Sequence, residues 1–219
     1  MNDSKVLVYD GSFNGFLTAI FVGINEKIEI MGFQKTYSPQ KGLFVEALAI
    51  KTDISKAKKV WNSIEKKNST VLKNVYFAFL SEAEGIEFML YKYIQKLYAL
   101  LNPIELEQMA AVELKIAQLA KNVGREKQLT EVSVDFNVTN DNVYIAEIEP
   151  NFNVLPLVSR HFRLRYPNQQ WIVFDCKRNY GMYYNLGSVE IIDLETKTWF
   201  LNSNTMNNAF SQTDYRLAM

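Results

Sequence analysis

The apolar residues of this chain change their spacing near Arg125, and this change restricts the fold more than any other feature. From Asp53 to Gly124 they recur every three or four residues, the period of helices that bury one face. After Glu131 they alternate, as in half-buried strands. The alternating residues are Val132, Val134 and Phe136, then Val143, Ile145 and Ile148. The pattern predicts an α+β fold in which a mixed β-sheet packs against a central helical region of about residues 53–124.

The helical region divides into four predicted helices. Thr52 or Asp53 is placed to cap the first, and Asn102-Pro103 separates the third from the fourth. The helices start near Ile54, Ser69, Gly85 and Ile104, and the last extends to Lys121 or beyond with Gly124 near its end. A turn at Thr139–Asn142 then joins the alternating segments into a predicted hairpin.

A short strand opens the chain. Lys5–Tyr9 is rich in β-branched and aromatic residues and runs into the turn Asp10–Ser12. Helical spacing from Phe13 to Phe21 predicts that a helix follows, with Asp10 or Ser12 as its cap. A strand, a glycine-containing loop and a helix can hold an anion on exposed amides, but a bare tight turn fits this pattern better.

The remaining segments complete one predicted domain. Leu43–Lys51 predicts a strand, whereas Glu26–Gln40 fits neither period. Near the C-terminus the predicted order is a helix from Val154 to Pro167 and strands at Trp171–Cys176, Met182–Asn185 and Val189–Leu194. We expect one mixed sheet that contains the Lys5 strand and the strands after Glu131. The single domain covers residues 4–198, and a polar tail covers residues 199–219.

Composition excludes several classes of protein. The 24 basic and 24 acidic residues cancel, which argues against the long-range field of many nucleic-acid-binding proteins. A lone cysteine, Cys176, excludes an internal disulfide and a cysteine-based zinc site and fits a reducing compartment. No segment approaches the roughly 18 apolar residues of a membrane span, and Met1–Asp3 does not begin a signal peptide. We expect a soluble, cytoplasmic protein.

Positive charge is concentrated in the stretch Ser159–Tyr184. This stretch has five cations against one acid, Asp175. The cations are Arg160, Arg163, Arg165, Lys177 and Arg178, and the aromatic residues nearby are Trp171, Tyr180, Tyr183 and Tyr184. Guanidinium groups bind phosphate oxygens and aromatic rings stack on bases, so an anionic partner is predicted here. A structural network of arginine–carboxylate pairs fits the same composition about equally well.

The only histidine, His161, lies in the same stretch. On a helix it shares a face with Arg165, whereas Phe162 and Tyr166 share another. A carboxylate at Asp175 or Glu149 would orient the imidazole as a general base near neutral pH. A buried histidine without a catalytic role is the somewhat stronger alternative. No spacing of acidic residues and histidine predicts a metal site, and no cofactor is indicated.

Several segments together resemble a known family. They are YDGSFNGFLTAIF at Tyr9–Phe21, IKTDISKAKKV at Ile50–Val60, GRE at Gly124–Glu126, and the long segment from Glu149 to Asn185. The chain resembles a bacterial domain-of-unknown-function family whose members are described as DNA-metabolism or DNA-repair proteins. They are typically encoded beside a radical-SAM DNA-repair protein, and some are fused to a uracil-DNA glycosylase domain. The resemblance implies a radical-SAM protein and DNA as partners.

Two motifs carry the candidate site residues. The first motif supplies Asp10, Gly11, Ser12, Phe13 and Gly15, and the second supplies His161, Phe162, Arg165, Trp171, Asp175 and Arg178. As a catalytic set we predict His161, Asp175, Asp10 and Ser12. As ligand-binding residues we predict Gly11, Phe13, Gly15, Arg165, Trp171, Arg178 and Tyr180.

The leading hypothesis is an accessory protein of DNA repair or DNA modification that acts with the radical-SAM partner and binds phosphate through Arg165 and Arg178. One alternative is a hydrolase-like or transferase-like enzyme that uses His161 with Asp175 or Asp10. Another is a non-catalytic scaffold for the partner protein, in which every motif serves folding.

Overall fold

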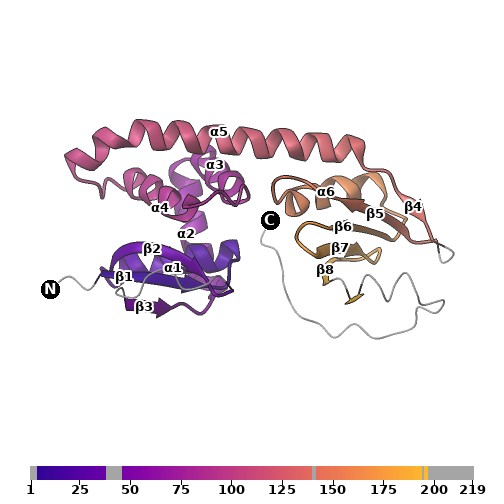
Figure 1. The fold of residues 1–219 in the computed structure, drawn as a ribbon, viewed down its shortest axis with the longest axis horizontal. Coiled ribbons are helices and arrows are strands. Elements are labelled where there is room, and N and C mark those ends of the chain that lie inside the picture. The colour runs from indigo at the N-terminus through magenta and orange to yellow at the C-terminus, as the bar shows by residue number, and fades with distance from the viewer. Residues whose placement is uncertain (1–3, 38–45, 140–141, 194, 197–219) are drawn as a thin grey trace. The chain divides into compact units, whose positions relative to one another are not determined.

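The structure is a computed structural model that describes residues 4–37, 46–139, 142–193 and 195–196 (Figure 1). The chain divides between Val123 and Gly124 into two compact units. The predicted α+β fold, with helices in the middle of the sequence and a mixed sheet, is confirmed. Whether the two units behave as the predicted single domain stays a prediction, and the polar tail lies outside the described residues.

The first unit contains a parallel sheet of three strands. These are β1 (Ser4–Tyr9), β2 (Glu29–Lys35) and β3 (Glu46–Ala49), in the order β2-β1-β3. The central strand β1 buries Leu7 and Tyr9. Because β1 has a neighbour on both sides, its carboxyl end places the turn Asp10–Ser12 at the middle of one sheet edge.

Four complete helices belong to this unit. They are α1 (Phe13–Asn25), α2 (Ile54–Lys67), α3 (Ser69–Phe79) and α4 (Ile86–Leu97). The first two pack closely against each other, and their caps resolve the alternatives left open by the sequence. Ser12 caps α1 by accepting a hydrogen bond from the amide of Gly15, and Asp53 caps α2 through the amides of Ser55 and Lys56.

The longest helix is α5 (Pro103–Ser133), which begins in the first unit and whose residues from Gly124 onward belong to the second. The predicted end near Gly124 was wrong, as was the predicted strand at Val132–Phe136. An ion pair one turn apart, between Lys127 and Glu131 at 2.7 Å, supports the last turns of the helix. Val132 lies in the last turn of the helix, and Val134 follows its end at Ser133. Their alternation in the sequence therefore does not come from a strand.

The second unit contains a mixed sheet of five strands. These are β4 (Asn137–Val138), β5 (Tyr144–Ile148), β6 (Trp171–Asp175), β7 (Tyr180–Tyr184) and β8 (Val189–Asp193), in sequence order across the sheet. Only β5 and β6 are parallel, and helix α6 (Leu155–Arg165) connects them. The expectation of one sheet containing the Lys5 strand was wrong, because among the described residues β1 pairs with β2 and β3 and not with the strands of the second unit.

Strand β6 is buried along its whole length, and its two faces belong to different cores. Trp171 and Val173 pack with Phe162 of α6, whereas Ile172 and Phe174 pack with residues of β5, β7 and β8. The side chains therefore alternate between the two faces along this strand. Its central position in the sheet explains why nearly every residue is apolar.

Two other boundaries differ from the sequence prediction. The ambiguous segment Glu26–Gln40 contains β2, an edge strand in which Ile30 is the buried residue and Met31 is 56% exposed. An edge strand with few buried positions gives a weak apolar pattern. Helix α4 ends at Leu97 instead of Leu101 because Ala99 adopts a positive φ of 54°, which stops the helix.

No helix within the described residues is long and apolar enough to cross a membrane.

Replacement of Trp171 by alanine tests the packing of the second unit. The indole is fully buried between Phe162 and Tyr184, so we expect Trp171→Ala to lower the free energy of unfolding by about 3–5 kcal/mol. Chemical denaturation followed by circular dichroism measures the loss. The control is Val132→Ala, whose side chain is 80% exposed and whose loss should stay within about 0.5 kcal/mol. Equal losses in the two variants would contradict the packing described.

Candidate functional site

The parallel pair β5 and β6 defines one edge of the second sheet where two loops emerge. The loop Glu149–Asn153 follows β5 and leads into α6, and Cys176–Asn179 follows β6. Because β5 and β6 are parallel, the carboxyl ends of both strands meet at this edge. In open α/β sheets such an edge is where ligands bind. It is therefore the place to examine the residues of the second motif.

The side chain of Glu126 holds the first of these loops. Its Oε1 accepts hydrogen bonds from the amide of Asn151 at 2.8 Å and from Asn151 Nδ2 at 3.1 Å, and its Oε2 accepts from the amide of Phe152 at 2.7 Å. These amides precede α6 and have no partner within that helix. A carboxylate of the chain itself thus satisfies them.

Arg178 holds the same loop from the other side. Its Nη1 donates to the carbonyl of Pro150 at 3.2 Å and to Asp175 Oδ2 at 2.9 Å, and its Nη2 donates to the carbonyl of Asn151 at 3.0 Å. Asp175 is fully buried, and its Oδ1 also accepts from the amides of Lys177 and Arg178. The sequence left open whether this arginine binds a phosphate or belongs to a structural ion pair. The structure supports the ion pair, because the guanidinium is directed at the protein.

Tyr180 and Trp171 are also held inside the unit. The hydroxyl of Tyr180 donates to Asn153 Oδ1, and the indole of Trp171 is fully buried and stacked on Tyr184. Trp171 is therefore not exposed for stacking on a base. We call Glu126, Pro150–Asn153, Asp175, Arg178 and Tyr180 the loop network.

His161 lies elsewhere on α6 and is not oriented by the predicted carboxylates. Its Nδ1 is 3.8 Å from Glu131 Oε1, an oxygen that also accepts a hydrogen bond from Lys127 at 2.7 Å. Its Nε2 is buried and lacks a hydrogen-bond partner among the described residues. Asp175 cannot take the expected role, because its carboxylate is occupied by Arg178 and the following amides. Glu149 is exposed and lines a cleft to which His161 does not belong.

Three arginines of α6 remain exposed to solvent. They are Arg160, Arg163 and Arg165. Arg165 lies over the ring of Tyr166, with its Cζ 5.7 Å from the ring centroid, and its Nε donates to the tyrosine hydroxyl at 3.2 Å. For Arg160 and Arg163 there is no hydrogen bond or ion pair to any described residue.

In the first unit the predicted residues gather around Asp10. Its Oδ1 accepts from the amide of Ser12 at 2.9 Å and from the hydroxyl of Ser12 at 2.7 Å, and its Oδ2 accepts from the hydroxyl of Thr52 at 2.7 Å. Burial raises the pKa of Asp10, but the hydrogen bonds from Ser12 and Thr52 outweigh it and lower the pKa below its ordinary value. The carboxylate therefore ties the end of β1 to the segment that enters α2.

Two glycines of the first motif allow this arrangement. Gly11 has a φ of +84°, and a Cβ there would lie 2.8 Å from the ring of Tyr37. At Gly15 a Cβ would lie 2.2 Å from Asp10 Oδ1 and 2.9 Å from Thr52 Oγ1. The positive φ favours glycine at position 11, and the contact with the Asp10 carboxylate excludes a larger residue at position 15.

Phe13 of the same motif belongs to an aromatic cluster. Its ring centroid lies 4.9 Å from that of Tyr76, 5.1 Å from that of Phe79 and 5.9 Å from that of Trp61. The ring therefore joins α1 to α2 and α3 instead of facing a ligand. The Asp10 turn lies in the first unit and His161 in the second, and the prediction that they form one cleft stays a prediction.

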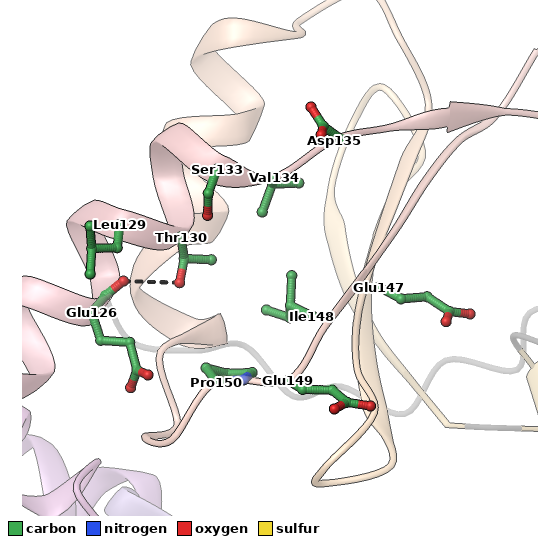
Figure 2. Close-up of a pocket in the computed structure, with 10 residues that line it drawn as sticks. All are labelled: Glu126, Leu129, Thr130, Ser133, Val134, Asp135, Glu147, Ile148, Glu149 and Pro150. Carbon is green, nitrogen blue, oxygen red and sulfur yellow. Dashed lines mark hydrogen bonds between the residues drawn. The ribbon is translucent and has the colours of Figure 1, made fainter.

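A cleft of about 480 Å³ lies beside the loop network and carries four acidic residues. They are Glu126, Asp135, Glu147 and Glu149. Figure 2 shows Val134 and Ile148 between these residues, with the carboxylates pointing in different directions. Within the described parts of the chain, no group of three or more histidine, cysteine, aspartate or glutamate side chains is arranged to hold a metal ion.

Sequence reasoning missed Glu126, Thr52 and Glu131 as partners of the predicted residues. Two of these residues lay in segments that the resemblance had quoted, GRE for Glu126 and IKTD for Thr52. The segments were too short for a role to be assigned to any one position. For Glu131 there was no such signal, because the predicted hairpin placed it outside a helix.

Arg178→Ala should destabilise the second unit strongly. It leaves the fully buried Asp175 without its cation, which costs about 3–5 kcal/mol, and it frees the loop Glu149–Asn153. Chemical denaturation measures the loss. The control is Arg163→Ala, an exposed arginine expected to change stability by less than about 0.5 kcal/mol. A stable Arg178→Ala protein that had lost only ligand binding would contradict the structural role.

Gly15→Ala should destabilise the first unit by roughly 1–3 kcal/mol, because the new Cβ displaces the Asp10 carboxylate and breaks its hydrogen bonds. Gly32→Ala is the matched control, since a Cβ there meets nothing within 4 Å. In the Asp10→Ala background, Gly15→Ala should cost clearly less, and a double-mutant cycle measures the difference. Additive losses would show that Asp10 is not the group displaced.

One family model matches the chain. It covers residues 84–215 and describes a domain of unknown function, DUF4130. No curated protein sequence matches the chain significantly. The match includes the GRE segment and all of Glu149–Asn185, whereas the Asp10 turn lies outside it. Because the model covers more than half of the sequence, the chain belongs to the DUF4130 family of domains of unknown function.

Proposed function

We propose that the protein is an accessory factor of DNA repair or DNA modification that acts with a radical-SAM partner and binds nucleic-acid phosphates through helix α6. The resemblance of its motifs to DNA-metabolism proteins supports the biological setting. The observation that carries the phosphate-binding part is the exposure of Arg160 and Arg163, which have no ion-pair partner among the described residues.

We assign the phosphate contact to the exposed arginines of α6 and not to Arg178, because the guanidinium of Arg178 is directed at the protein. Arg160 and Arg163 are three residues apart, so they lie one above the other on the helix surface. Guanidinium groups bind phosphate oxygens through paired hydrogen bonds. Arg165 lies two residues after Arg163, so the two side chains point to different sides of the helix, and Tyr166 already accepts one hydrogen bond from Arg165. Arg165 is therefore not part of the proposed surface.

The charge balance of the chain defines what kind of binding to expect. With a formal net charge of zero, attraction to nucleic acid must come from this local group of arginines. Binding through so few phosphate contacts is weak, and its salt dependence is shallow because the slope grows with the number of phosphates contacted. We therefore expect little sequence preference, because phosphate contacts position a protein without reading bases.

Binding to labelled single-stranded and double-stranded oligonucleotides, measured by fluorescence anisotropy at several salt concentrations, tests the proposal. The variant Arg160→Ala/Arg163→Ala should weaken binding and reduce the slope of log K against log salt by about 1.8 for double-stranded DNA. The control Lys115→Ala/Lys121→Ala removes the same charge from exposed positions of α5 and should change little. Undetectable binding of the wild-type protein at low salt would refute phosphate recognition.

The partner is tested separately by co-purification with the radical-SAM protein. We expect association to persist in His161→Ala, because the proposal gives this side chain no role in the complex. If the α6 arginine variant loses the partner while DNA binding is absent in all proteins, the arginines serve a protein interface and the nucleic-acid part is wrong. The enzyme alternative with His161 stays a prediction of the sequence.

A further inference from the structure

A second cleft, in the first unit, is mostly apolar. It has a volume of about 470 Å³ and lies between α1, α2 and the end of α4. Its lining includes three buried residues, Ile20, Val60 and Ile94, one from each helix. Two further apolar residues of the lining are open to solvent, Ile24 at 38% and Leu100 at 52% exposure. This volume and lining are those of sites that hold small organic ligands.

Three lysines of α2 lie along one border of this cleft. Lys56, Lys59 and Lys67 lie on one side of the helix together with Ser63, at spacings of three and four residues. The Nζ atoms of Lys56 and Lys59 lie 6.0 Å and 5.7 Å from the ring centroid of Phe21, which lines the cleft. The two ammonium groups are therefore held at its border.

The third lysine is at the other end of the same border. Lys67 Nζ lies 4.8 Å from the ring centroid of Tyr98, another lining residue. The hydroxyl of Tyr98 donates to Ser63 Oγ at 2.6 Å, which leaves the hydrogen of the serine hydroxyl available to a ligand. No acidic side chain is among the described residues that line the cleft.

We propose that this cleft binds a small amphipathic anion, with an aliphatic or aromatic body on Ile24, Val60 and Leu100 and an acidic head group at Lys59 and Ser63. Apolar burial supplies the affinity, and the lysines select the sign of the head group. The site is independent of the arginines of α6, because every residue that lines it belongs to the first unit.

Isothermal titration calorimetry with three probes of equal chain length tests the charge selection. Octanoate, octanol and octylammonium each contain eight carbons in an unbranched chain and differ in the head group. We expect octanoate to bind most tightly, octanol more weakly and octylammonium least. Binding of octylammonium as tight as that of octanoate, or no binding of octanoate at millimolar concentration, would overturn the proposal.

Two substitutions locate the site. Lys59→Glu should weaken octanoate binding by about tenfold, the effect of losing one hydrogen bond to a charged group. Lys58→Glu makes the same charge change about 100° around α2, at a residue that does not line the cleft, and should leave the affinity unchanged. Ile24→Asp, at an exposed position of the lining, should also abolish octanoate binding. Equal effects of Lys58→Glu and Lys59→Glu would show that net charge, and not this cleft, controls binding.

Stability measurements accompany each variant. Lys58, Lys59 and Ile24 are exposed, so the three proteins should keep the wild-type circular dichroism spectrum. Lys59→Gln is a milder version that removes the charge without reversing it, and its affinity should lie between those of the wild type and Lys59→Glu. A variant that binds octanoate as tightly as the wild type although Lys59 is neutral would also contradict the assigned head-group site.

Discussion

The contact on which the second unit most depends is the ion pair between Asp175 and Arg178. A carboxylate that is fully buried is tolerable only when a cation and several hydrogen-bond donors surround it. Arg178 provides the cation and at the same time donates to the carbonyls of the loop that follows β5. The position of α6, and with it the exposed arginines, is thus coupled to the end of β6.

In the first unit a carboxylate also holds a loop after a strand, but at a lower desolvation cost. Asp10 is exposed, so its hydrogen bonds to Ser12 and Thr52 do not require a buried charge. They close the turn between β1 and α1 and fasten it to the entry of α2. In each unit a part of the sequence motif lies where a strand ends, Asp10–Ser12 after β1 and Asp175 with Arg178 at the end of β6, and the rest lies in helices or within strands. Several of these residues, such as Trp171 and Phe13, serve packing.

The sequence predicted the fold class, the first strand and the strand at Trp171–Cys176, because these depend on local apolar spacing. It failed at two places. The alternation of Val132 and Val134 imitated a strand, whereas α5 continues to Ser133 and the ion pair of Lys127 with Glu131 supports its last turns. The membership of β1 in a separate sheet depends on pairing with β2, whose apolar signal is weak.

The candidate residues divide in the same way. The location of Asp10–Ser12 in a turn after the first strand followed from turn chemistry, but the partners of the candidate residues did not follow from the sequence. The sequence suggested Asp175 as the partner of His161 because both lie in one polar stretch. In the structure Asp175 forms an ion pair with Arg178, and the carboxylate near His161 is that of Glu131. A composition rich in arginine does not distinguish a guanidinium that holds a loop from one that faces solvent. Burial makes that distinction.

The loop network has a consequence for the order of assembly during synthesis. Glu126 precedes the loop it holds by 25 residues, whereas Arg178 follows it by about the same distance. In a nascent chain that has been synthesised as far as α6, Glu126 is therefore present to bind the loop, but Arg178 and the neighbouring strand β6 are not. The carbonyls of Pro150 and Asn151 acquire their native partner only after β6 has been made. The second unit is consequently completed late, by its own C-terminal strands.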